Sequence, residues 1–170
     1  MVNRSVDDRR HVSDSLIAVE ILIRTFAPDD QDAVLDLASR IATGIAPWLD
    51  ESKVLAAFAG FARDDMSRED SDDAVVLVAE AETHVVGFAT VGVQAHWSGD
   101  RQVYIGLLAV DERSEGNGVG RALVERAKDW ARDRGLRRIM LDIGAANHHA
   151  RGFYARLGFE EEAVRLSASV

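Results

Sequence analysis

One glycine-rich stretch, residues 107–122, constrains the chain more than any other. It starts with an apolar run that ends at Val110, continues through a polar turn with Gly116, Gly118 and Gly120, and enters an amphipathic segment. Because glycine has no Cβ, alternating glycines let a ligand approach the backbone closely. Several N–H groups can then converge at the positive end of a helix dipole, which suits phosphate or pyrophosphate. The stretch therefore predicts a strand, an anion-binding loop and a helix.

Other phosphate-binding loops do not fit this spacing. A dinucleotide-binding G-x-G-x-x-G that starts at Gly116 needs glycine at position 121, where the chain has Arg121. The Gly-Lys-Ser/Thr ending of a P-loop is also absent. A plain glycine-rich turn between strand and helix is the alternative that remains.

Residues 115–120 resemble the Q/R-x-x-G-x-G/A signature of the GNAT superfamily of N-acyltransferases, which hold the pyrophosphate of an acyl-coenzyme A. The chain departs at the first position, which is Glu115, although Arg113 and Arg121 flank the loop. The resemblance implies that backbone groups of the preceding strand pair with the pantetheine arm and that one N–H polarises the thioester carbonyl. The implied coenzyme-binding residues are Leu108, Ala109, Val110, Gly116, Asn117, Gly118, Val119, Gly120 and Arg121.

A second segment, residues 147–159, resembles the family signature N-x-x-A-x-x-F-Y-x-x-x-G-F at every fixed position. The resemblance implies that Tyr154 is the general acid that protonates the leaving thiolate. The alternative is a half-buried helical tyrosine with a hydrogen-bonded hydroxyl. Asn147 fits both a helix cap and a coenzyme contact.

The general base is less well marked. The strand position at which some family members carry glutamate falls on Tyr104 or Ile105, neither of which is basic. Other members carry an acidic residue five positions before the motif asparagine, which is Asp142 here. We therefore expect Asp142 to draw a proton through water, with a pairing to Arg137 or Arg138 as the alternative.

Three of the five histidines, His96, His148 and His149, are further candidates for a base or a metal ligand. The adjacent pair is typical of a solvated helix start, and no third ligand is in view. We therefore expect no metal site.

The charge pattern favours an anionic cofactor and a cationic acceptor. The 170 residues carry a net charge of −9, yet residues 113–138 hold eight basic and four acidic residues. The alternative is a solvated helix face with internal ion pairs. An acidic chain argues against nucleic-acid binding. The stretch 64–73 holds six acidic residues, which indicates an exposed connector or an acceptor-attracting patch.

The sequence predicts one domain over residues 16–170, preceded by a flexible arm over residues 1–15. No apolar run approaches the ~18 residues of a membrane span, so no membrane association is expected. The chain has no cysteine, which excludes disulfides and thiol chemistry and makes the cytoplasm the default location.

The order of elements follows from periodicity and turn residues. A β-bulge is expected where two large apolar residues are adjacent, at Leu107–Leu108. We expect strands over 19–26, 74–80, 85–93, 102–110, 138–143 and 159–168, and helices from 28, over 50–63, from 118 and from 147.

The expected fold is a mixed α/β GNAT fold, with a twisted, largely antiparallel sheet, helices on both faces and a V-shaped opening at splayed strands. The implied reaction is direct transfer of an acetyl group from acetyl-CoA to an amine of a small molecule or a protein. Alternatives are a degenerate module that binds acyl-CoA as a sensor, and an enzyme for a longer acyl group. A homodimer is possible, because the sequence does not determine the oligomeric state. Candidates for the acceptor-site wall are Trp48, Phe58, Phe61, Trp97 and Tyr104, although core packing also suits Phe58 and Phe61.

Overall fold

The computed structural model describes residues 20–42, 45–68 and 71–169. The arm predicted over residues 1–15 lies outside the described residues. Five strands form one sheet in the order β1-β2-β3-β4-β5, antiparallel except for the β4–β5 pair. The strands are β1 (Leu22–Thr25), β2 (Ala74–Ala81), β3 (His84–Ala95), β4 (Arg101–Val110) and β5 (Ile139–Met140). The helices are α1 (Gln31–Ala38), α2 (Glu51–Met66), α3 (Val119–Asp133) and α4 (His148–Arg156), with 3-10 turns at Pro28–Asp30, Ser39–Ala42 and Glu112–Ser114.

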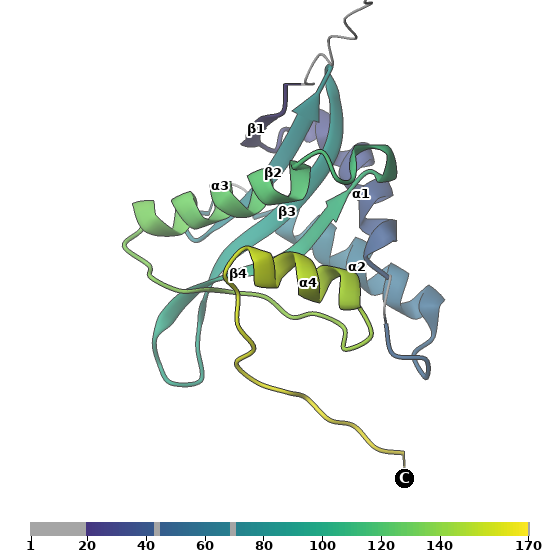
Figure 1. The fold of residues 1–170 in the computed structure, drawn as a ribbon. Coiled ribbons are helices and arrows are strands. Elements are labelled where there is room, and N and C mark those ends of the chain that lie inside the picture. Colours follow the sequence, from purple (N-terminus) through teal and green to yellow (C-terminus); the bar gives the residue numbers. More distant parts are fainter. Residues whose placement is uncertain (1–19, 43–44, 69–70, 170) are drawn as a thin grey trace, which may run out of the picture.

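Helices cover both faces of the sheet, α3 and α4 on one and α1 and α2 on the other (Figure 1). The α3/α4 core is the cluster that includes Leu77, Val103, Leu123 and Trp130. The α1/α2 core is the cluster that includes Val34, Val76, Phe88 and Leu107. The predicted mixed α/β fold with helices on both faces is confirmed. No helix within the described ranges is long and apolar enough to cross a membrane.

The predicted bulge in β4 is present, but at Gly106. The strand pairs Leu107 with Thr90 and Ile105 with Val91, so Gly106 is the extra residue. Because side chains alternate along a strand, one extra residue reverses the faces beyond it. Val103 and Ile105 accordingly join the α3/α4 core, whereas Leu107 and Ala109 join the α1/α2 core.

Local signals in the sequence explain several boundaries. Asp50 caps α2, because its carboxylate accepts a hydrogen bond from the Lys53 N–H at 3.2 Å. The β2–β3 hairpin turns through Glu82 and Thr83, whose φ angles are 49° and 70°. Two consecutive residues with positive φ are typical of the tight turns that match strand twist.

The strand predicted over residues 159–168 is wrong. Residues 159–169 form no helix or strand and extend away from the sheet (Figure 1). They would have to pair beyond β5, which itself spans only Ile139–Met140 instead of the predicted 138–143. Without a neighbouring strand, Val164 and Leu166 are 75% and 88% exposed.

We predict that Gly87→Val destabilises the protein. A Cβ at Gly87 would lie 2.9 Å from Val119 Cγ1 and 3.1 Å from the Ala109 carbonyl oxygen, which overpacks the contact between β3 and α3. Such overpacking costs about 1–3 kcal/mol in the free energy of unfolding, measured by urea denaturation. Gly60→Ala is the control, because a Cβ there meets nothing within 4 Å and alanine favours a helix. An equally stable Gly87→Val protein would contradict this packing.

Candidate functional site

The loop between β4 and α3 is held by its own hydrogen bonds. The Asp111 N–H donates to the Val86 carbonyl at 2.8 Å, and the Asp111 carboxylate accepts from the Arg113 N–H at 2.9 Å. The Ser114 N–H donates back to the Asp111 carbonyl at 2.9 Å. The chain then turns through Gly116 and Gly118, whose φ angles are 79° and 86°. Only glycine adopts such angles freely, so the turn requires glycine at both positions.

The same turn leaves an open space at the start of α3. A Cβ at Gly116 or Gly118 would meet no atom within 4 Å. Ala122 is the residue whose N–H bonds back to Gly118, so the preceding N–H groups of the helix have no intrahelical acceptor. We call residues 116–121 the anion cradle, because these groups lie at the positive end of the α3 dipole.

Gly120 has a packing role in addition to the coenzyme contact expected of it. Its Cβ would lie 3.2 Å from Phe153 Cζ and 3.6 Å from Val110 Cγ2. The glycine therefore lets α4 pack against the first turn of α3. Val119 is also a packing residue, because its side chain is buried in the α3/α4 core. This contact joins the two sequence signatures, which are far apart along the chain.

The basic segment of the sequence separates into two parts. Along α3, Lys128 pairs with Glu125 at 3.0 Å and Arg132 pairs with Asp129. The predicted alternative of internal ion pairs thus holds for the body of the helix. Beside the cradle, Arg113 and Arg121 are exposed and form no ion pair within the described residues.

The sheet opens directly beyond the last β4–β5 pairs, which are Val103–Ile139 and Tyr104–Met140. β4 continues to Val110 along β3 alone. Since the Asp111 N–H faces β3, strand alternation directs the backbone groups of Ala109 to β3 and those of Leu108 and Val110 to the open edge. The splayed opening expected from the sequence is therefore present.

Tyr154 lies in the α3/α4 core and is 8% exposed. Its ring contacts those of Phe153 and Phe159, with centroids 4.9 Å and 5.4 Å away. Burial raises the pKa of its hydroxyl to about 12. Among the described residues the hydroxyl has no hydrogen-bond partner, so the alternative of a hydrogen-bonded tyrosine is not what the structure shows. Buried hydroxyls are normally paired, and an orphan hydroxyl is a candidate ligand contact.

Asp142 is exposed and accepts a hydrogen bond from the Tyr104 hydroxyl at 3.2 Å. Burial raises the pKa of Tyr104 to about 12, and the negative charge of Asp142 adds to this shift. Asp142 is therefore partnered by a tyrosine, where the alternative from the sequence named Arg137 or Arg138.

The histidines are placed apart. The His96 ring lies 2.8 Å from the Glu162 carboxylate, whereas His148 and His149 are exposed at the start of α4. Within residues 20–42, 45–68 and 71–169, no group of three or more potential ligands is arranged to hold a metal ion.

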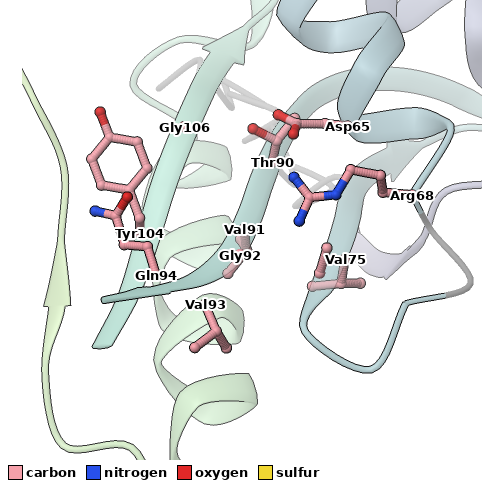
Figure 2. A pocket seen from close by; sticks show the side chains of 11 residues that line it. Asp65, Arg68, Val75, Thr90, Val91, Gly92, Val93, Gln94, Tyr104 and Gly106 are labelled. Atoms are coloured by element: carbon pink, nitrogen blue, oxygen red, sulfur yellow. The ribbon is translucent and has the colours of Figure 1, made fainter. Parts of the chain in front are cut away.

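A pocket of about 150 Å³ lies where α2 ends against β3 and β4 (Figure 2). The Asp65 carboxylate and the Thr90 hydroxyl point toward one another on one side, and Tyr104 and Gln94 lie on the other. Burial raises the pKa of Asp65, opposed in part by the hydrogen bond from Thr90 and the charge of Arg68. Of the aromatic residues predicted to form an acceptor wall, Tyr104 lines this pocket, whereas Trp48 and Trp97 are exposed.

Sequence reasoning did not single out Asp65, because the acidic stretch 64–73 was interpreted as a whole, as an exposed connector or an acceptor-attracting patch. In the structure Asp65 lies within α2. A signal was available in helical spacing, since Phe58, Ala62 and Asp65 recur at intervals of four and three residues. These intervals place the carboxylate on the inward face of α2.

Comparisons with known proteins show the family to which the chain belongs. The profile of the acetyltransferase (GNAT) family matches residues 31–159, and the chain belongs to that family. An uncharacterized N-acetyltransferase of Methanocaldococcus jannaschii is 32% identical over 146 residues, which are 84% of this chain and 62% of that protein. Mycothiol acetyltransferase of Amycolatopsis mediterranei is 31% identical over 144 residues, 82% of this chain and 46% of that protein. The chain thus spans about half to two thirds of the length of these relatives.

A solved structure shows the same fold. PaiA N-acetyltransferase from Thermoplasma acidophilum, in complex with coenzyme A, aligns with a TM-score of 0.73 and 18% identity over 86% of this chain and 93% of its own.

We predict that Asn147 stabilises the protein by capping α4. Its side-chain oxygen accepts a hydrogen bond from the Ala150 N–H at 3.0 Å and so caps α4. Asn147→Ala should lower the free energy of unfolding by about 1 kcal/mol, whereas Asn147→Asp should preserve it, because aspartate caps equally well. Chemical denaturation measures both variants. Equal losses in both would contradict a pure capping contribution to stability.

Proposed function

We propose that the chain is an N-acetyltransferase that moves an acetyl group from acetyl-CoA directly to an amine. The observation that carries the proposal is the contact of Gly120 with Phe153. It holds α4, with the orphan hydroxyl of Tyr154, beside the anion cradle and the open edge of β4. A phosphate site, a strand edge and a proton donor thus adjoin in one region.

The chain's residues fit acetyl-CoA. The cradle has open space, and the first N–H groups of α3 have no intrahelical acceptor and can bind a pyrophosphate. Arg113 and Arg121 add positive charge. The outward backbone groups of Leu108 and Val110, with Ala109 between them, suit the amide-bearing pantetheine arm. The coenzyme complex of the PaiA neighbour supports this assignment. The residues proposed to hold the coenzyme are Leu108, Ala109, Val110, Gly116, Asn117, Gly118, Val119, Gly120, Arg121 and Asn147.

When bound, acetyl-CoA supplies an activated acyl group and a thiolate leaving group. The chain must then supply a proton to the leaving sulfur and remove one from the acceptor amine. Tyr154 remains protonated at neutral pH, since its pKa is about 12, and can donate to the departing sulfur. The acceptor arrives as an ammonium with a reference pKa near ~10.4 and must lose a proton before it attacks. The sequence predicts Asp142 as the base that takes this proton through water.

The acceptor is proposed to be a cationic amine of a small molecule or a protein. The net charge of −9 favours a positively charged partner. Cytoplasmic residence is proposed with it, which fits a cysteine-free sequence.

A coenzyme-binding sensor is the second candidate. Glu115 favours it, because this position places a carboxylate where the family signature has glutamine or arginine. Calorimetric titration with acetyl-CoA, followed by a panel of amines with thiol detection, separates the two. Thiol release with one class of amine supports the enzyme, and binding without release from any amine supports the sensor. No binding of acetyl-CoA refutes both.

We predict that Gly118→Glu abolishes coenzyme binding. A carboxylate in the cradle repels a pyrophosphate and blocks its approach to the backbone. Gly99→Glu is the matched control, because Gly99 also has a positive φ, 92°, and open space around its Cβ position. Both variants place glutamate at a backbone position with positive φ, but only Gly118→Glu should weaken coenzyme A binding, by about 100-fold or more in calorimetry. Equal affinities of the two variants would refute the cradle.

We predict that Tyr154→Phe lowers kcat by about 100-fold, as expected for the loss of a general acid. Coenzyme affinity and stability should change little, because the hydroxyl has no partner among the described residues whose hydrogen bond would be lost. Steady-state kinetics and thermal denaturation measure these effects. A variant with unchanged kcat would exclude Tyr154 as the proton donor.

A further inference from the structure

The pocket at the end of α2 is lined by Gly106, the bulge residue of β4. A Cβ at Gly106 would lie 2.8 Å from Thr90 Oγ1 and 3.6 Å from Asp65 Oδ2. The Asp65 carboxylate therefore lies over the one residue of β4 that has no side chain. Gly106 follows Tyr104, the last β4 residue paired with β5, by two positions. The carboxylate is thus placed where the sheet opens.

The carboxylate is held by a relay of two hydrogen bonds. The Leu107 N–H donates to Thr90 Oγ1 at 3.0 Å, and the Thr90 hydroxyl donates to Asp65. Thr90 is 2% exposed, so its rotamer is fixed by packing. The relay uses one acceptor site of the carboxylate and leaves the others for a ligand. Figure 2 shows the two groups facing each other at the pocket.

Within the described residues, the charged groups near Asp65 form no ion pair with it. Arg68 lines the same pocket from the end of α2, yet within the described residues Asp65 and Arg68 form no ion pair. Arg68 favours the ionised form of Asp65 and Asp64 disfavours it, and Tyr104 is the titratable group on the facing strand β4. Since burial outweighs these effects and raises the pKa of Asp65, the carboxylate is a stronger base than an exposed aspartate.

We propose that Asp65 binds the ammonium group of the acceptor in this pocket and accepts its proton. The inference rests on the proposed function and names the acceptor site and the base within it. The small volume suits a primary amine on an unbranched carbon, with the rest of the acceptor outside.

The proton balance is complete with groups already described. Asp65 takes one proton from the ammonium, and the freed nitrogen lone pair forms a bond to the acetyl carbon as the carbon–sulfur bond breaks. The sulfur leaves with the electron pair and takes a proton from Tyr154, which recovers one from the nitrogen. Asp65 then releases its proton to water. One ammonium and one thioester become one amide, one thiol and one proton.

The first test is binding without turnover. The protein saturated with coenzyme A is titrated with 1,4-diaminobutane, and with 1,4-butanediol as the uncharged probe. We expect the diamine to bind and the diol not to bind, and Asp65→Asn to weaken diamine binding at least 10-fold. Asp64→Asn, an exposed carboxylate one residue away, should leave binding unchanged. Absent diamine binding, equal affinity of Asp65→Asn, or an equal loss in Asp64→Asn would overturn the inference.

Stability gives a second readout that a purely structural carboxylate would not share. A pKa raised by folding contributes stability that is present below the unfolded pKa and is lost as pH rises through the folded pKa. Asp65→Asn should therefore raise the melting temperature at pH 7, and the gain should shrink as the pH falls from 7 toward about 4, where the wild-type carboxyl becomes protonated in both the folded and the unfolded protein. A lower melting temperature at pH 7 would assign Asp65 to structure.

Kinetics distinguish Asp65 from Asp142. Asp65→Asn should lower kcat/KM by about 100-fold near neutral pH and recover with rising pH, because more amine is then already unprotonated. Asp142→Asn should lower kcat/KM by a smaller factor. A larger loss in Asp142→Asn would return the role to that residue. If instead diamine binding depends on Asp65 but acetyl-CoA does not bind, the proposed function fails and the ammonium site stands.

Discussion

The extra residue in β4 is the constraint on which the rest of the structure depends. A regular strand would direct Val103, Ile105, Leu107 and Ala109 to one face. The bulge at Gly106 sends the first two into the α3/α4 core and the last two into the α1/α2 core. It also marks the place where β4 parts from β5. One inserted residue thus lets β4 supply side chains to both cores and lies where the sheet opens between its last two strands, β4 and β5.

A bulge interrupts the ladder, and the interrupted groups need partners. The buried Leu107 N–H finds one in the Thr90 hydroxyl at 3.0 Å, which avoids the cost of an unpaired buried amide. The Thr90 hydroxyl in turn donates a hydrogen bond to the Asp65 carboxylate. Structure and candidate chemistry therefore share the same atoms. The residue that repairs the strand also orients the carboxylate.

Local patterns in the sequence were sufficient for much of this arrangement. The adjacency of Leu107 and Leu108 predicted the bulge to within two residues, because two neighbouring apolar side chains cannot share one face of a regular strand. The cradle glycines and the Asn147 cap were equally readable, since turns and caps are decided by a few adjacent residues. The strand expected over 159–168 failed because strand formation needs a partner, and local pattern does not reveal that β5 ends at Met140. Asp65 was hidden for a similar reason, since its burial depends on how α2 packs.

The proposed reaction divides its chemistry between the two faces of the sheet. The cradle and Tyr154 lie with α3 and α4, where a raised pKa keeps the tyrosine a proton donor. Asp65 lies on the opposite side, at the end of α2, where burial makes the carboxylate a better proton acceptor. In the proposed transfer the acid and the base act on different groups, the leaving sulfur and the attacking amine, and the sheet lies between the two side chains. The opening beyond Tyr104 is then the place where an acyl group from one face and an amine from the other can meet. Gly106, which has no side chain, is the extra residue at the point where the two proposed groups approach the opening from opposite faces.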